Sequence, residues 1–410
     1  MMRHPPSPPC TRRTRGASSR SSCAPESSAA SCRVPPARRS GERHCYARIM
    51  SGRDGQRIAV VGAGVIGAAT AYELSRAGAR VLILDAGQIA GGATRDAFAW
   101  VGLAASAADM AQAALRRIAS NELDRLAAEL ALPVALNRAG ALSWSEARGK
   151  PDAQLTIDPA LHAVVRIASR EEVGTREPGL RTPPDSAVLA ETDGSVDPVA
   201  LTRALISGAL ANGAEFVPET RVEEILTEHG QVTGLRTSSG SIAVDTVVLA
   251  AGTGTTELAH GVGVRVPVNS SPCILLRFRT PGRLVHGIVS GPEFELRQPS
   301  DTVLLAAEDY IDNSAENGPE AVAQRALEVI RQEIVGADGI LLDEIRVGQR
   351  PIPSDGRPII GYASVSGLYV TAAHAGIALA AGIGTLAAEE SLTGRRHEAL
   401  ETFRPTRFSD

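Results

Sequence analysis

The sequence predicts an α/β fold, and three stretches of the chain carry that prediction. Residues 57–85 have the pattern of a buried strand, a glycine-rich turn, a helix and a second strand, as at the start of a parallel sheet. Residues 245–252 form another short apolar run that ends in Ala-Ala-Gly. Between residues 273 and 307, apolar and polar residues alternate in several short runs, which is typical of antiparallel strands. We therefore expect one parallel sheet with crossover helices and one largely antiparallel sheet.

The turn in the first stretch has the Gly-x-Gly-x-x-Gly spacing of dinucleotide-binding loops. Gly62 permits the tight turn, Gly64 lets the backbone approach a pyrophosphate, and Gly67 lets the helix pack closely on the strand. The N-terminus of that helix offers unpaired N–H groups and a partial positive charge to phosphates. Asp85, at the end of the second strand, is placed to accept hydrogen bonds from a ribose. Together these features predict a bound dinucleotide.

The remaining elements are predicted in chain order from hydrophobic periodicity. The expected helices cover residues 109–131, 199–211, 321–334 and about 375–391. The alternating runs cover residues 273–278, 284–289, 294–298 and 303–307. Further strands are expected at residues 214–217, 222–226, 232–237, 242–244, 345–352 and 368–371. On the first of these helices, Arg116, Arg117 and Arg125 are expected to form the solvated face.

Composition narrows the function classes. A chain of 410 residues with 43% hydrophobic content can bury a large core in one or two domains. The ten Arg and two Glu of residues 1–50 leave the rest of the chain acidic, which argues against a nucleic-acid partner. Only Cys273 lies outside those first residues, so we expect no disulfide framework and a cytoplasmic location. The other four Cys lack metal-ligand spacing, and no metal site is predicted.

Residues 1–53 are predicted to be a disordered leader rich in Arg, Pro and Ser. They lack the apolar segment of a secretory signal. Two interpretations stay open: an organelle transit peptide, or upstream sequence that precedes a natural start at Met50. Residues 367–388 carry no charge, but Gly and Ala dominate them and a strand precedes the helix, so no transmembrane segment is predicted.

Three stretches together resemble the FAD-dependent oxidoreductases related to D-amino acid oxidase, a group that includes glycine oxidase, sarcosine oxidase and D-amino acid dehydrogenases. They are VVGAGVIGAATAYELSRAGARVLILD, TVVLAAGTGT and GQRPIPSDGRPIIG with GLYVTAAHAGIALAAGIGTLAAEE. The resemblance covers about residues 57–393 and is specific for the cofactor rather than the substrate. It implies an α/β fold with a Rossmann-like FAD-binding domain, interleaved with an α+β substrate domain built on a large mixed or antiparallel sheet.

The resemblance also implies how the chain is divided. We expect the FAD-binding domain to comprise residues 54–140, 187–264 and 341–395. The substrate domain is expected to comprise residues 141–186 and 265–340, and residues 396–410 to form a C-terminal tail.

The family likeness further implies which residues hold FAD. The positions that match its phosphate, ribose, adenine and flavin contacts are Gly62, Gly64, Val65, Ile66, Gly67, Asp85, Ala93, Thr94, Arg95, Val222, Ala251, Gly252, Ala375, Gly376 and Ile377. A helix that begins near Ala375 would direct N–H groups at the flavin edge where negative charge develops. Residues 346–357 contain no Cys, so the FAD is expected to be bound non-covalently.

Two residues are candidates for catalysis. Arg350 stands where several amine oxidases of this group carry the Arg that binds the substrate carboxylate, which suits its forked donors; a structural ion pair is the alternative. His374 is a candidate base or flavin hydrogen-bond partner; a packed, hydrogen-bonded turn histidine is the alternative. Arg297, on an antiparallel strand, is a weaker candidate for carboxylate binding.

The expected reaction is oxidation of the C–N bond of an amino acid or secondary amine to an imine, with O2 or a respiratory acceptor taking the electrons. The only Lys, Lys150, is not placed like the lysine that some of these oxidases use with oxygen, which favours a dehydrogenase. Two other interpretations stay open: an NAD-linked dehydrogenase, and a non-catalytic or accessory flavin-binding subunit of a larger oxidoreductase complex.

Overall fold

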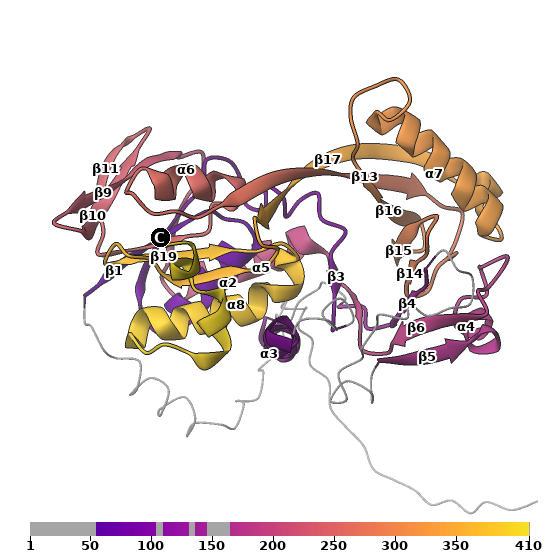
Figure 1. The fold of residues 1–410 in the computed structure, drawn as a ribbon, viewed down its shortest axis with the longest axis horizontal. Coiled ribbons are helices and arrows are strands. Elements are labelled where there is room, and N and C mark those ends of the chain that lie inside the picture. The colour runs from indigo at the N-terminus through magenta and orange to yellow at the C-terminus, as the bar shows by residue number, and fades with distance from the viewer. Residues whose placement is uncertain (1–54, 104–109, 131–135, 146–164, 410) are drawn as a thin grey trace, which may run out of the picture.

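Two sheets organise the molecule (Figure 1). The computed structural model describes residues 55–103, 110–130, 136–145 and 165–409. The six-stranded sheet lies in the left half of Figure 1 and the eight-stranded sheet in the right half, and two long strands, β13 and β17, run along the top between them. The leader predicted for residues 1–53 falls outside the described residues.

The six-stranded sheet contains the glycine-rich turn. Its strands, in spatial order, are β18 (Ile359–Tyr362), β19 (Leu368–Ala372), β12 (Thr246–Leu249), β1 (Arg57–Val61), β2 (Arg80–Leu84) and β8 (Glu215–Val217). Every neighbouring pair is parallel except β18 and β19. Because parallel strands end at the same edge, the loops that follow β1, β12 and β19 meet there.

Four helices cover this sheet: α2 (Val65–Arg76), α3 (Met110–Glu129), α5 (Pro198–Ala211) and α8 (Gly376–Thr393). Helix α8 is buried on nearly all sides because it packs against both α2 and α3. Small residues permit the close approach to α2, since a Cβ on Gly384 would lie 2.7 Å from the Cβ of Ala69. Helix α5 begins where it was expected: the Asp197 carboxylate accepts from the N–H groups of Val199 and Ala200, and Pro198 is the first helical residue.

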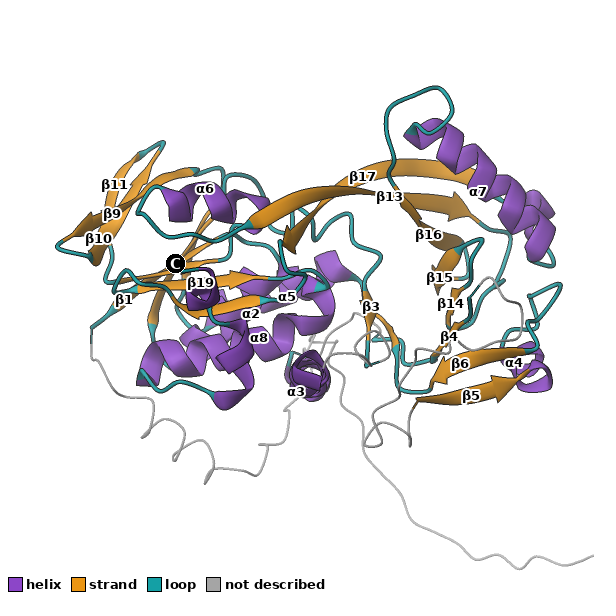
Figure 2. Ribbon diagram, viewed as in Figure 1, coloured by secondary structure: helices purple, strands orange, loops and turns teal. Residues whose placement is uncertain are grey.

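The eight-stranded sheet curves from β13 down to β5 (Figure 2). Its strands, in spatial order, are β17 (Leu341–Pro353), β13 (Val268–Arg279), β16 (Val303–Asp309), β15 (Glu295–Ser300), β14 (Ile288–Ser290), β4 (Ala141–Ser143), β6 (Ser186–Ala190) and β5 (Val165–Ser169). All pairs are antiparallel except β14 with β4. Helix α7 (Pro319–Glu333) covers one face, and its buried residues Val322, Leu327 and Ile330 share a core with Leu276 and Phe278.

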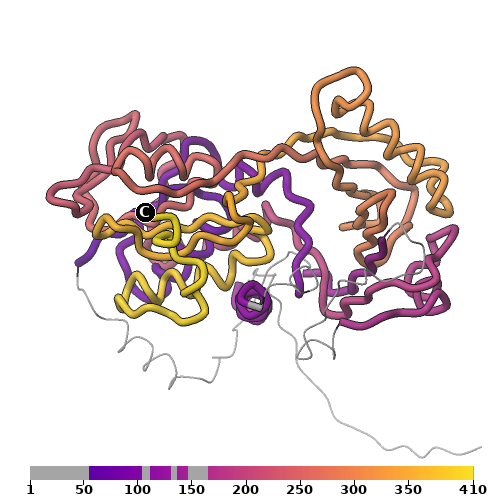
Figure 3. Tube along the Cα trace, viewed as in Figure 1, coloured from indigo at the N-terminus to yellow at the C-terminus, as the bar shows by residue number. Residues whose placement is uncertain are grey.

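Smaller elements complete the fold. They are β3 (Trp100–Val101), α4 (Arg170–Arg176), β7 (Gly194–Ser195), β9 (Val222–Glu228), β10 (Gln231–Thr237), β11 (Gly240–Ala243), α6 (Thr255–His260) and the 3-10 turns η3 (Gly252–Gly254), η4 (Ala337–Gly339), η5 (Glu398–Phe403) and η6 (Pro405–Phe408). The trace in Figure 3 shows the C-terminal segment returning to the six-stranded sheet.

The predicted fold class is confirmed: a parallel nucleotide-binding sheet stands beside a large mixed sheet. Two local predictions were wrong. The strand expected at residues 284–289 is shorter and begins later, as β14 at Ile288–Ser290. Residues Leu284 and Val285 lie outside it because their backbone N–H groups donate to the side chain of Gln298. Arg116 is not on a solvated face; it is 8% exposed, and its Nη1 donates to the carbonyl of Gly102.

The domain boundaries remain a proposal. Strand β17 and residues 187–190 of β6, which the predicted ranges assign to the FAD-binding domain, pair within the eight-stranded sheet. We therefore propose that residues 186–190 and 341–353 belong to the substrate domain and that the other predicted boundaries stand.

Candidate active site

A cavity of about 1220 Å³ lies where the two sheets face each other. Its wall combines the turns after β1 and β12, the beginning of α8, and parts of β13, β16 and β17. Arg350, His374 and all but two of the predicted cofactor-binding residues line it. The three loops of small residues, far apart in the sequence, therefore surround one space.

The glycine turn has the close packing that its spacing predicts. Gly62 has a φ of 113°, and a Cβ there would lie 2.3 Å from the carbonyl oxygen of Ala250. A Cβ on Gly67 would lie 2.0 Å from the carbonyl oxygen of Gly62. Gly64 differs, because its backbone is extended and the nearest atom to an added Cβ is Thr94 Oγ1 at 3.4 Å. The missing side chain of Gly64 therefore keeps the cavity open.

The N-terminus of α2 faces this opening. The N–H of Val65 donates to the hydroxyl of Thr94 over 3.1 Å, and both residues are buried. The other N–H groups of a first helical turn have no partner within the helix. With Ile66 also in the wall, the helix can present these donors to an anionic group in the cavity.

Asp85 holds two loops together at the edge of the cavity. Its Oδ2 accepts from the N–H of Ala63 over 2.7 Å, and its Oδ1 accepts from the N–H of Gly87 over the same distance. A carboxylate has about four acceptor positions, so two backbone bonds leave capacity for ribose hydroxyls. The ribose contact of Asp85 stays a prediction.

Four further predicted cofactor-binding residues in the cavity wall have short side chains or none. Ala93 comes from the loop after β2, Val222 begins β9, and Ala251 and Gly252 follow β12. No side chain among these four is long enough to fill the cavity, so a flat, extended ligand can lie along the backbone.

The two predicted residues outside the wall are Gly67 and Arg95. Gly67 acts through packing, as described above. Arg95 is exposed; its N–H donates to the carbonyl of Gly92, and its own carbonyl accepts from Arg346. Arg95 therefore contributes to this loop through its backbone, and a flavin contact of its side chain stays a prediction.

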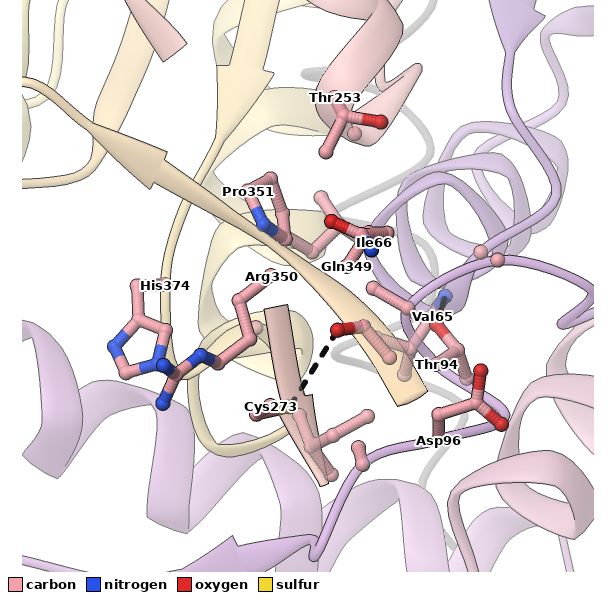
Figure 4. A pocket seen from close by; sticks show the side chains of 18 of the residues that line it. Val65, Ile66, Thr94, Asp96, Thr253, Cys273, Gln349, Arg350, Pro351 and His374 are labelled. Atoms are coloured by element: carbon pink, nitrogen blue, oxygen red, sulfur yellow. Dashed lines mark hydrogen bonds between the residues drawn. The ribbon is translucent and has the colours of Figure 1, made fainter. Parts of the chain in front are cut away.

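Arg350 extends from β17 toward His374 (Figure 4). Its Nη2 donates to Ser271 Oγ over 3.1 Å and to the carbonyl of Pro272 over 3.2 Å. Among the described residues, the carboxylate paired with it is that of Asp309, at 3.9 Å, and the Asp309 side chain is 91% exposed. Neutral acceptors thus orient the guanidinium, while its charge is only weakly paired and faces the cavity.

His374 lies in the turn between β19 and α8 and also lines the cavity. Although the His374 side chain is exposed, partial loss of hydration, and then the positive charges of Arg350 and Arg116, lower its pKa below the usual value. The lowered pKa favours the neutral ring, which offers one donor and one acceptor nitrogen.

Ala375 and Gly376, at the beginning of α8, are small, so a ligand can approach the backbone there closely. Ala375 has a left-handed φ of 58° at the N-cap, and the helix starts at Gly376. A Cβ on Gly376 would lie 3.4 Å from Cδ1 of Ile66. Ile377 completes the first turn, whose free N–H groups are available to a partial negative charge.

Arg297, the weaker candidate, is not part of the cavity wall. It is 3% exposed, its Nε donates to the carbonyl of Phe98, and the guanidinium carbon lies 5.5 Å from the centre of the Phe98 ring. Burial lowers the pKa of Arg297 to about 10. Its contacts support the Phe98 loop instead of a substrate.

Sequence reasoning missed several polar residues of the wall, among them Asp96, Cys273, Glu295, Glu308 and Asp309. The alternating pattern placed Cys273 and Glu295 on strands, but only the register between strands shows which residues face the cavity. Cys273 pairs with Gly348 of β17 and with Asp309 of β16, so three distant segments meet in one row.

These residues fit FAD: an open glycine backbone at a helix N-terminus, an acid at the next strand end, a narrow wall of small residues, and a second helix start. A glycine turn at a helix N-terminus and a weakly paired cation around one cavity agree with a dinucleotide-dependent oxidoreductase. The family model described as FAD dependent oxidoreductase (DAO) matches residues 57–390, and the chain belongs to this family. The predicted family and the FAD-dependent class of enzyme are thereby confirmed.

Individual relatives agree with that family. The chain is 27% identical over 312 residues to a D-amino-acid oxidase of Bradyrhizobium diazoefficiens, a match that covers 69% of this chain and 70% of that protein. It is 26% identical over 375 residues to an opine oxidase subunit of Rhizobium meliloti, covering 86% and 97%. It is 30% identical over 228 residues to a 4-methylaminobutanoate oxidase (formaldehyde-forming) of Paenarthrobacter nicotinovorans, but spans only 27% of that relative.

The solved glycine oxidase from Geobacillus kaustophilus has the same fold. Its TM-score is 0.75 at 24% identity, and the match covers 87% of this chain and 100% of that chain. Within the described part of the chain, no helix is both long and apolar enough to cross a membrane.

Proposed function

We propose that the protein oxidises the C–N bond of an amino acid or secondary amine to an imine, which water then hydrolyses. Bound FAD would supply the acceptor for a hydride from the carbon next to the amine. The observation that carries the proposal is the weakly paired guanidinium of Arg350 in the same cavity as the glycine turn. A substrate carboxylate can form two parallel hydrogen bonds with it.

The roles of the chain's own residues follow from their positions. Arg350 would bind and orient the substrate carboxylate. The first turn of α8 would direct its N–H groups at the negative charge that develops on the flavin edge. His374, whose surroundings favour the neutral ring, would hold a hydrogen bond or receive a proton at the substrate amine. O2 or a respiratory acceptor would take the electrons.

We propose that FAD is held without a covalent bond. Cys273 is the cysteine of the cavity wall, and burial raises the pKa of its thiol, which donates weakly to the carbonyl of Gly348. A protonated thiol is a poor nucleophile. Precipitation of the purified protein with acid should therefore leave all yellow colour in the supernatant; colour retained in the pellet would contradict this.

The reaction is tested by anaerobic mixing of the purified yellow protein with single D-amino acids, L-amino acids and N-methyl amines. Loss of the flavin absorbance with a member of this panel is the expected result. A colourless protein whose fluorescence responds to NADH would overturn the cofactor assignment in favour of an NAD-linked enzyme.

A second candidate is an accessory flavin-binding subunit of a larger oxidoreductase complex. The match to the opine oxidase subunit, of which the chain covers 97%, favours it. In that case the protein would be yellow but would bleach with no panel member until a partner subunit is added.

A further inference from the structure

We propose that Glu295 selects substrates with a cationic side chain, so that the substrate class is the basic amino acids. The proposal rests on the proposed function, in which Arg350 binds the substrate carboxylate. It adds the group that would recognise the other end of the substrate.

The strand register places Glu295 on the same face of the eight-stranded sheet as Arg350. Glu295 pairs with Ala307, and Asp309 lies two residues along β16 and so on the same face. Asp309 pairs with Cys273 of β13, and Arg350 pairs with a residue two positions before Cys273. The next residue, Leu296, points to the other face and packs under α7.

Glu295 has little compensation for its charge. Its carboxylate accepts one long hydrogen bond, 3.4 Å from the hydroxyl of Ser290. Within the described part of the chain it has no ion pair. Burial, with a smaller contribution from the negative charge of Asp309, raises the pKa of Glu295. A sheltered carboxylate without a cation is unfavourable, and a ligand cation at this position would relieve that cost.

The spacing of the two charged groups selects the length of the ligand. The guanidinium of Arg350 lies 3.9 Å from Asp309. One strand spacing and two residues separate the Cα atoms of Asp309 and Glu295, which is roughly 8 Å. Glu295 therefore does not contact the Arg350 guanidinium, and the two charges stand apart along the cavity wall. A ligand that holds Arg350 through its α-carboxylate can reach Glu295 only with a cation several bonds farther along its side chain, as in lysine and arginine; glycine and sarcosine carry no second cation.

The test uses the purified flavin-containing protein with D- and L-lysine and D- and L-norleucine, each with a free and an N-methylated α-amine. Norleucine has the chain of lysine without the ammonium group. We expect lysine to perturb the flavin spectrum and raise the melting temperature at concentrations at least ~10-fold lower than norleucine, the scale of a charged hydrogen bond. Glu295→Gln should abolish this difference. Glu328→Gln, on the exposed face of α7 outside the cavity, should preserve it.

The outcomes separate this proposal from the proposed reaction. Equal or tighter binding of norleucine to the unmodified protein overturns the role of Glu295, even if norleucine is oxidised. Tighter binding of lysine without any bleaching supports the role of Glu295 and contradicts the reaction. If Glu295→Gln does not fold, Glu295→Met decides the matter, because it removes the carboxylate at similar size and should abolish the preference for lysine. A preference for lysine that survives in a folded variant without the carboxylate overturns the proposal.

Discussion

The hydroxyl of Thr94 accepts a hydrogen bond from the N–H of Val65 over 3.1 Å, at a point where both residues are buried. This bond ties the loop after β2 to the first turn of α2. Because the helix itself offers no acceptor to that N–H, Thr94 supplies the missing partner at the edge of the cavity. The loop and the helix start therefore form one unit around the phosphate position.

Thr94→Val should lower the stability of the protein even in the absence of the cofactor. Valine keeps the shape but removes the acceptor, so a buried N–H is left without a partner. We expect the free energy of unfolding of the flavin-free protein to fall by about 1–3 kcal/mol in a denaturant titration. Thr175→Val, which removes an exposed hydroxyl on α4, is the control and should change little. Equal effects of both substitutions would contradict the structural role of Thr94.

Substitution of two glycines in the same turn should separate packing from cofactor binding. Gly64→Ala has an ordinary backbone conformation and 3.4 Å to the nearest atom, so the flavin-free protein should fold normally and bind FAD poorly. Gly67→Ala brings a Cβ within 2.0 Å of the Gly62 carbonyl and should lower the melting temperature of the flavin-free protein as well. Thermal unfolding and FAD titration of both variants check this. Normal FAD affinity in Gly64→Ala would refute a pyrophosphate at that position.

The sequence predicted the structure best where the chemistry of a site restricts the residue types at a few neighbouring positions. The turn at residues 62–67 and the start of α8 at residues 375–377 both need small residues at fixed spacing, and the structure brings them to one cavity. Secondary structure followed for the same reason, because hydrophobic periodicity is local.

Sequence reasoning failed where a residue's environment depends on distant segments. Arg116 follows the pattern of a solvated helix face, but the loop at Gly102 covers it. Glu295 and Asp309 belong to the cavity only because three strand pairings align them with Arg350. No local pattern in a single sequence encodes that register.

Arg350→Ala should raise the Michaelis constant for a carboxylate-bearing substrate by ~10-fold to ~1000-fold, as the loss of a charged hydrogen-bonding group does. Arg350→Lys should recover only part of this loss, because a single ammonium cannot form the two-bonded contact. An amine without a carboxylate is the control, and its constant should not respond. Steady-state kinetics at several substrate concentrations measures all three; an unchanged constant for the carboxylate substrate would remove Arg350 from the site.

Glu308 should make stability fall as the pH rises. Burial, then the negative charges of Asp309 and Glu295, raises the pKa of Glu308 from 4.5 to about 7, although Arg325 partly opposes this. Between these two values the folded state binds more protons than the unfolded state, so the free energy of unfolding decreases with increasing pH. The loss is at most about 3 kcal/mol.

Glu308→Gln removes that titration. The variant should match the parent protein near pH 4.5 and be more stable at pH 8. Urea unfolding of both proteins at these two pH values checks the expectation. A difference in free energy that is the same at both pH values would show that Glu308 does not titrate in this range.

Arg404 and Glu390 anchor the C-terminal tail on α8. Their side chains are 6% and 1% exposed, and the two hydrogen bonds between them measure 2.6 and 2.7 Å. The hydroxyl of Tyr369 also donates to Glu390 over 2.8 Å.

Arg404→Met would leave the Glu390 carboxylate buried without its cation, which typically costs about 3–5 kcal/mol. Arg404→Met combined with Glu390→Gln should cost less than Arg404→Met alone, because the uncompensated charge is gone. Denaturant titrations of the two single variants and the double variant measure the coupling; strictly additive losses would mean that the pair does not act as a unit.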